Sequence, residues 1–269
     1  SQFTELLYLN HSTKYFLSSL NLHTFFRMIR DLKNRLTKFF AELTLFSLEV
    51  FVLLAVFIVA LVAFIFIARM VFEGNTHQFD EKVFSLISAY VSNINTSIMR
   101  FITILGTHLF LIPANLALTA WFLFIKKRRW NSIKIPAVAL SSLLLMFFLK
   151  LIFHRERPLI PLLEAAKGFS FPSGHALMSV TFYGLLIVIA WENIKSTWLR
   201  WSLSIGLALL IIVIGLSRVY LRVHYASDVV AGFCVGIVWL LLSVSILSKL
   251  EKYGRRKIEL APESVDNVS

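Results

Sequence analysis

The feature that most constrains this 269-residue sequence is a set of six long apolar runs. The clearest run covers residues 50–68, nineteen residues without a polar side chain. A helix needs about 20 apolar residues to cross the hydrocarbon core of a bilayer. The other five runs, all uncharged, cover residues 101–125, 135–149, 176–190, 201–217 and 229–248. With 58% hydrophobic residues, the sequence predicts an all-α polytopic membrane protein with a bundle of six transmembrane helices.

Three parts of the chain can be separated by composition. Residues 1–44 contain apolar positions near helical spacing with basic residues between them, which predicts a cytoplasmic amphipathic helix lying on the inner leaflet. A helix that docks on a soluble partner is the alternative for this segment. Residues 45–250 hold the six spans, and residues 251–269 form a basic and then polar cytoplasmic tail.

The positive charges predict the orientation. Of the 27 lysines and arginines, 18 lie before residue 50, in 126–134, in 191–200 or after residue 248. These segments share one side if the six spans alternate, and the positive-inside rule makes that side the cytoplasm, with both termini there. The net charge of +12 therefore indicates anionic lipid headgroups as partners, and we expect no nucleic-acid binding. A second amphipathic segment, residues 79–98, follows the first span outside and has no predicted chemistry.

Three polar clusters lie at the ends of the shorter runs. The third run goes outward and ends at Lys150, and the fourth begins outside after His175. The fifth ends outside before Arg218, and the sixth begins outside after His224. All three clusters therefore meet at the outer face, where ionisable groups at span ends indicate a single active site.

The cations in these clusters indicate a phosphoryl ligand. Lys150, Arg157 and Arg218 would converge at one membrane surface, and three cations suit a multiply charged anion. We expect no metal, because Asp228 is the only acid that the sequence places in the cluster.

The remaining residues suit binding and attack. Ser173 fits a helix N-cap, and the first N–H groups of that helix favour an anion, with Gly174 removing a side chain that would block close backbone approach. His224 and Asp228 are four residues apart and would share a helix face, so that the carboxylate holds one ring nitrogen and leaves the other free to attack. Each piece alone has a simpler interpretation: a snorkelling lysine, a helix-start His–Asp pair, a Pro-Ser-Gly-His turn, or an Arg-Pro loop breaker.

Together the motifs resemble the three signature segments of the type 2 phosphatidic acid phosphatase (PAP2) superfamily. They read KLIFHRERP (150–158), PSGH (172–175) and SRVYLRVHYASD (217–228). Their order and internal spacing fit at every motif position. The six-span layout extends the resemblance over residues 45–250, and the N-terminal segment lies outside it.

The resemblance implies a metal-independent phosphatase that needs no cofactor and forms a phosphohistidine. His224 would be the nucleophile, Asp228 would orient it, and His175 would protonate the departing oxygen and later activate water. The residues that would hold the phosphoryl oxygens are Lys150, Arg157, Ser173, the Gly174 amide and Arg218.

The substrate implied is a membrane lipid phosphate or diphosphate, cleaved at the extracytoplasmic face of a bacterial inner membrane. Undecaprenyl diphosphate, phosphatidylglycerol phosphate and phosphatidate are the candidates, with the phosphates of lipid A as an alternative. Short outer loops, 151–172 and 220–227, favour a small headgroup. A soluble vanadium haloperoxidase shares these motifs but does not fit six spans, and a lipid or anion transporter would carry its charges nearer the bilayer midplane.

Overall fold

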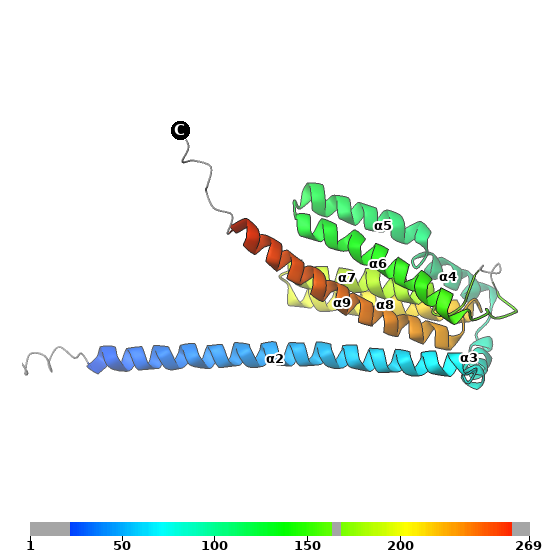
Figure 1. Cartoon of the computed structure of the whole chain (residues 1–269), viewed down its shortest axis with the longest axis horizontal. Helices are drawn as coiled ribbons and strands as arrows, with labels where there is room; N and C mark the ends of the chain where they lie inside the picture. Colours follow the sequence, from blue (N-terminus) through cyan, green and yellow to red (C-terminus); the bar gives the residue numbers. More distant parts are fainter. Residues whose placement is uncertain (1–21, 163–167, 260–269) are drawn as a thin grey trace, which may run out of the picture. The chain divides into compact units, whose positions relative to one another are not determined.

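The computed structural model describes residues 22–162 and 168–259, and within these ranges all regular structure is helical. Residues 1–21 of the predicted N-terminal segment and 260–269 of the predicted tail lie outside the described residues. The helices are α2 (Leu22–Phe72), α3 (His77–Ser88), α4 (Asn93–Ile104), α5 (His108–Ala120), the π-helical η1 (Trp121–Ile125), α6 (Arg129–Phe153), α7 (Gly174–Asn193), α8 (Thr197–Tyr220) and α9 (Ala226–Glu259) (Figure 1).

Six stretches of these helices are long and apolar enough to cross a membrane, which confirms the all-α, six-span prediction. Most extend beyond the runs seen in the sequence, because polar residues at the membrane surface continue the helix. The stretches are Val50–Phe72, Asn93–Ile125, Arg129–Phe153, Gly174–Asn193, Thr197–Tyr220 and Ala226–Arg255.

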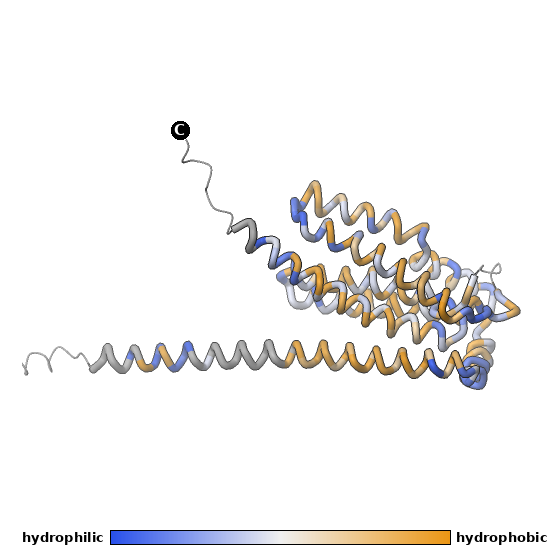
Figure 2. Tube along the Cα trace, viewed as in Figure 1, coloured by the Kyte–Doolittle hydropathy of each residue, from blue (hydrophilic) through white to orange (hydrophobic). Residues whose placement is uncertain are grey.

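Helix α2 joins the predicted interfacial segment to the first span without a break. The chain forms two compact units, Ser1–Ala55 and Val56–Ser269, and α2 passes from one to the other. In Figure 2 the hydrophobic colour dominates the part of α2 that forms the span and is interrupted by a hydrophilic residue near the end of the helix. The placement of the amphipathic part on the inner leaflet stays a prediction.

Helix α7 lies at the centre of the bundle formed by the second unit. Half of the residues in its most hydrophobic stretch are buried, and its most extensive contacts are with α8 and α9. Gly232 and Gly236 of α9 face α7, and a Cβ added at Gly236 would lie 2.8 Å from Val180 Cβ. Small residues four apart allow membrane helices to approach closely, so these glycines determine how near α9 lies to α7.

The predicted amphipathic segment 79–98 is two helices and not one. Helix α3 ends at Ser88, and α4 begins after the N-cap Ser92, whose hydroxyl accepts a hydrogen bond from Asn95 N at 3.1 Å. The cap satisfies an N–H group that would otherwise lack a partner at the start of α4. The apolar face of α3 packs through Val83, Phe84 and Ile87 on a buried cluster that includes residues of α7, α8 and α9.

The predicted polar clusters meet at one end of the bundle. The C-terminal ends of α6 and α8 and the N-terminal ends of α7 and α9 lie together there, beside α3 and α4 (Figure 1). Ser173 N, just before α7, donates to Asp228 O in the first turn of α9 at 3.0 Å. The convergence predicted from the alternation of spans is therefore confirmed within the second unit.

Candidate active site

The first cluster begins where α6 ends. His154 follows the helix in the left-handed conformation, with φ 46°, and turns the chain away from the axis. Lys150 lies in the last turn, and its ammonium group donates to Phe169 O at 2.5 Å. The lysine is thereby tied to the segment that leads into α7, which is more specific than a snorkelling contact with lipid headgroups.

Arg157 is held by the loops on both sides of it. Its Nε donates to Gly168 O at 2.9 Å, and Nη1 donates to Val223 O at 2.7 Å. Nη1 also lies 3.3 Å from His224 Nε2. These contacts with the loops therefore hold the planar guanidinium in a fixed orientation beside His224.

The second cluster opens α7 as predicted. Ser173 is the N-cap and accepts from Ala176 N at 3.5 Å. The structure gives Gly174 a second role besides the predicted backbone approach, because an added Cβ would meet Met146 Sδ of α6 at 2.5 Å. Glycine at this position therefore serves helix packing. The Nε2 atom of His175 is buried and has no hydrogen-bond partner among the described residues.

Arg218 brings the third cation to the cluster from the end of α8. Its side chain is buried, and Nη1 donates to Thr103 Oγ1 of α4 at 2.6 Å. Its buried Nε has no partner among the described residues. The charges of Lys150, Arg157 and Arg218 act on one another, so the three predicted cations are brought together. A cluster of positive side chains of this kind is stabilised when an anion binds.

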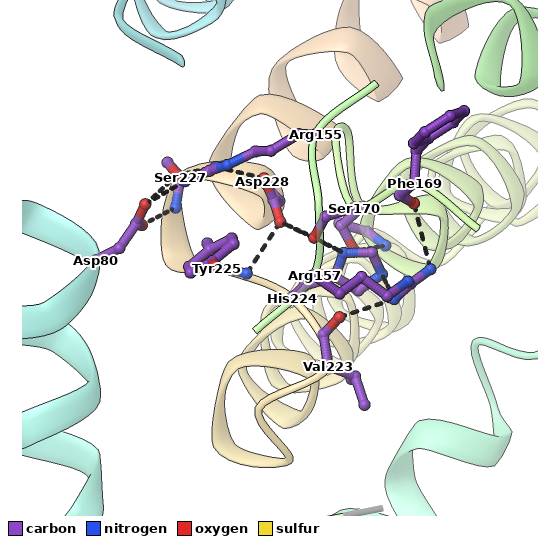
Figure 3. A network of polar contacts seen from close by, with 12 residues as sticks. Asp80, Arg155, Arg157, Phe169, Ser170, Val223, His224, Tyr225, Ser227 and Asp228 are labelled. Atoms are coloured by element: carbon purple, nitrogen blue, oxygen red, sulfur yellow. Dashed lines mark hydrogen bonds and ion pairs between the residues drawn. The ribbon is translucent and has the colours of Figure 1, made fainter. Parts of the chain in front are cut away.

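His224 lies in the turn before α9 and not on the helix, which corrects the predicted helical pair. Even so, its Nδ1 is 3.5 Å from Asp228 Oδ2 and 3.3 Å from Ser170 Oγ (Figure 3). Since a guanidinium can only donate, the contact between Arg157 and Nε2 requires a lone pair on Nε2 and places the imidazole hydrogen on Nδ1. This tautomer presents an unprotonated nitrogen to the cationic cluster.

Burial determines the charge state of His224, whose side chain is 2% exposed. The pKa of His224 is lowered to about 4, chiefly by burial and also by the charges of Arg157 and Arg218, while Asp228 acts in the opposite direction. Burial also lowers the pKa of Arg157, and the charge of Asp228 opposes that shift. His224 is therefore neutral at neutral pH and keeps its Nε2 lone pair.

Asp228 is not the only acid at this end of the bundle, so that part of our sequence interpretation was wrong. Asp80 of α3 is 1% exposed and accepts from Ser227 N at 2.9 Å and Ser227 Oγ at 2.8 Å. Arg155 joins the two acids, since Nη1 donates to Asp228 Oδ1 at 2.6 Å and Nη2 donates to Asp80 Oδ2 at 2.7 Å (Figure 3).

Three residues of this arrangement were missed from the sequence. Ser170 donates to Asp228 Oδ2 at 2.5 Å, and Arg155 and Asp80 form the second contact to the same carboxylate. The position of Arg155 inside the KLIFHRERP stretch could have indicated a role in the site. Asp80 gave no such signal, because its neighbour Glu81 is also acidic and is exposed. The residues described here contain no group of three His, Cys, Asp or Glu side chains arranged to hold a metal ion.

Comparisons with known proteins agree with the motifs. The family model described as the PAP2 superfamily matches residues 131–252. Phosphatidylglycerophosphatase B of Bacillus subtilis is 28% identical over 160 residues, which cover 59% of this chain and 78% of that protein. The putative undecaprenyl-diphosphatase YbjG of Escherichia coli is 28% identical over 186 residues, which cover 64% of this chain and 89% of that protein.

A solved structure shares the fold. The crystal structure of the first transmembrane PAP2 type phosphatidylglycerolphosphate phosphatase from Bacillus subtilis aligns with a TM-score of 0.67 and 24% identity, over 73% of this chain and 98% of that chain. The matched family segment contains all three motifs, and the six spans surround them. Residues 131–252 thus match the PAP2 superfamily, and the chain is an integral membrane phosphatase.

Proposed function

We propose that this chain removes the terminal phosphate of a membrane lipid phosphate or diphosphate through a phosphohistidine, without a metal ion. The observation that carries the proposal is the pair of contacts made by His224, whose Nε2 lies 3.3 Å from Arg157 Nη1 and whose Nδ1 lies 3.5 Å from Asp228 Oδ2. A neutral nitrogen beside bound cations is suited to attack phosphorus. The resemblance of the three motifs to those of PAP2 phosphatases supports the same reading.

In the first step His224 Nε2 forms a bond to phosphorus as the bond to the leaving oxygen breaks. The imidazole becomes positively charged, and Asp228 stabilises that charge through Nδ1–H. His175 Nε2, buried and without a partner among the described residues, donates a proton to the leaving oxygen. The negative charge of the bound phosphate offsets the neighbouring cations and so favours protonated His175.

In the second step water attacks the phosphorus of the phosphohistidine. His175, now neutral, accepts the proton of this water, the bond between phosphorus and Nε2 breaks, and His224 returns to its neutral form. The products are inorganic phosphate and the dephosphorylated lipid. Each histidine thus begins and ends the cycle in the same protonation state.

Charge at the transferred phosphoryl group is stabilised by the cations and by the start of α7. Lys150, Arg157 and Arg218 supply three positive charges within electrostatic range of one another. The Ser173 hydroxyl and the Gly174 N–H, at the N-terminus of a 20-residue helix, add donors where the helix dipole favours an anion. Donors fixed before the reaction act most strongly in a buried site.

The substrate class follows from where the site lies and from the relatives. The cluster is at the ends of candidate membrane-spanning helices, where we expect lipid headgroups, and the two curated relatives are named for a phosphatidylglycerophosphate and an undecaprenyl diphosphate activity. We place the site on the extracytoplasmic side of a bacterial inner membrane, with both termini in the cytoplasm, because 18 of the 27 lysines and arginines fall in the segments opposite the site.

The test is phosphate release by the purified protein in detergent from a panel of pure lipids. The panel contains undecaprenyl diphosphate, phosphatidylglycerol phosphate, phosphatidate and lipid A. We expect activity that survives EDTA, is inhibited by vanadate and is abolished in His224→Ala. Loss of activity on chelation that Mg²⁺ restores, or full activity in His224→Ala, would show that the proposed chemistry is wrong.

A further inference from the structure

A buried charge network extends from the His–Asp pair to helix α3. Arg155 Nη1 donates to Asp228 Oδ1 at 2.6 Å and to Ser227 Oγ at 2.7 Å. Its Nη2 donates to Asp80 Oδ2 at 2.7 Å and to Thr76 Oγ1 at 3.0 Å. These four hydrogen bonds all go to side-chain oxygens, and the guanidinium reaches the Asp228 carboxylate from the side opposite His224 (Figure 3).

The two oxygens of Asp228 have separate partners. Oδ1 accepts from Arg155, whereas Oδ2 accepts from Ser170 Oγ at 2.5 Å and from Tyr225 N at 2.9 Å, and lies 3.5 Å from His224 Nδ1. A partial rotation of the carboxylate would move both oxygens away from their partners. Arg155 therefore fixes the orientation of the oxygen that faces His224.

Asp80 has an electrostatic role in addition to a geometric one. A pair formed by Arg155 and Asp228 alone would be neutral, and would give little support to the positive charge that develops on phosphorylated His224. With Asp80, the three groups carry two negative charges and one positive charge, so one negative charge remains beside the histidine. A half-buried guanidinium shared between two buried carboxylates also satisfies donors on both sides.

We propose that Arg155 and Asp80 are positioning residues of the phosphoryl-transfer reaction, which keep the Asp228 carboxylate oriented and negative toward His224. Neither residue touches the phosphoryl group in this scheme, and both act through Asp228. The inference rests on the proposed function, because it assigns these residues to the attack by His224. Arg155 is further held by the ring of Tyr225, whose centroid is 4.1 Å from the guanidinium carbon.

A cavity beside Arg155 allows a direct experiment. Its volume is about 120 Å³, and its lining includes Arg155, Asp80, Thr76 and Tyr225. Truncation of Arg155 to alanine would enlarge this space toward both carboxylates. A free guanidinium ion, which has the planar donor geometry of the lost side chain, can then occupy the same position.

The experiment compares steady-state kinetics of the full-length variants Arg155→Ala and Asp80→Asn, with the lipid that the parent enzyme hydrolyses. Because a misplacement of about 1 Å can lower a rate 100-fold, we expect kcat to fall about 100-fold in Arg155→Ala and about tenfold in the nearly isosteric Asp80→Asn. KM should change little, since the phosphate contacts remain. Millimolar guanidinium chloride should raise kcat of Arg155→Ala at least tenfold and leave kcat of Asp80→Asn unchanged. A gain below tenfold would not stand out from the range of effects that indirect contacts have on activity.

Glu81→Gln is the matched control, because it removes the same charge from the adjacent, exposed residue that also lines the cavity. It should retain the kcat of the parent. If Arg155→Ala does not fold, Asp80→Asn decides the question. Parental kcat in folded Asp80→Asn, or a folded Arg155→Ala whose lost kcat guanidinium does not restore, would overturn the inference. Activity retained in His224→Ala would instead refute the proposed function itself, so the two failures are distinguishable.

Discussion

Gly232→Ala should show that the distance between α7 and α9 sets the geometry of the site. A Cβ at this position would lie 2.7 Å from Ser173 O, 2.9 Å from Ala176 Cβ and 3.4 Å from Leu177 N. Two of these three atoms belong to the backbone of α7 and its N-cap, so no flexible side chain can move aside. To restore ordinary contact, the start of α7 must recede by about 0.7 Å from α9 in a close-packed interior.

That displacement separates the two halves of the site. Ser173 and His175 move with α7, whereas His224 and Asp228 stay with the start of α9. Since about 1 Å of misplacement can cost 100-fold in rate, we expect kcat to fall between about 10- and 100-fold. Overpacking of this kind should also lower the free energy of unfolding by about 1–3 kcal/mol.

The assay is phosphate release by purified Gly232→Ala, measured well below its melting temperature so that the folded fraction stays constant. Gly206→Ala on α8 is the control, because a Cβ there meets nothing within 4 Å and should alter neither kcat nor Tm. A Gly232→Ala enzyme with kcat within about twofold of the parent would refute the reasoning, since it would mean that the catalytic groups tolerate separation of the helices.

Three further predictions concern chemistry and topology. With an activated aryl phosphate, His175→Ala should accumulate phosphohistidine on His224, because the leaving group needs no proton while hydrolysis of the intermediate still needs a base. The phosphohistidine would be detected as a base-stable label, and label on another residue would contradict this prediction. His224 must be neutral to attack, and its pKa is lowered to about 4, chiefly by burial, so kcat/KM should fall only as the pH drops toward 4. A fall centred near the ordinary histidine pKa would argue against a buried nucleophile. In a Cys234→Ala background, an impermeant thiol reagent should label Leu159→Cys in intact cells and Lys195→Cys only after permeabilisation, and the reverse pattern would invert the proposed orientation.

The spans and the position of the site could be predicted because both depend on local features of the sequence. An uninterrupted apolar run such as residues 50–68 has few other stable locations, and the alternation of spans then fixes which ends share a face. Helix ends were less accurate. The run at 101–125 begins inside α4, which starts at Asn93, because a serine N-cap starts that helix among polar residues that hydropathy alone assigns to a loop.

The support of the site depends on tertiary contacts and so could not be read from the sequence. Asp80 and Glu81 are adjacent acids on the same amphipathic helix, and only the rotation of α3 against α9 decides which one is buried. In the same way, the neighbour of Gly174 is Met146, 28 positions earlier in the chain, and no spacing rule connects them. The sequence therefore predicted a role for Gly174 beside the anion but could not show its packing against α6.

The burial of Asp228 explains why so many distant residues converge on it. Its side chain is 0% exposed, and an ionised carboxylate removed from water is stable only when donors replace the lost hydration. Arg155 and Ser170 supply two of these donors, from positions 73 and 58 residues away in the chain, and both come from the segment between α6 and α7. Asp228 therefore gains these two donors only when that segment has docked on the first turn of α9. The same contacts stabilise the folded bundle and orient the carboxylate beside His224. A change that weakens them should therefore lower stability and kcat together. Loss of a phosphate-binding cation such as Lys150 should instead lower activity with a smaller effect on stability.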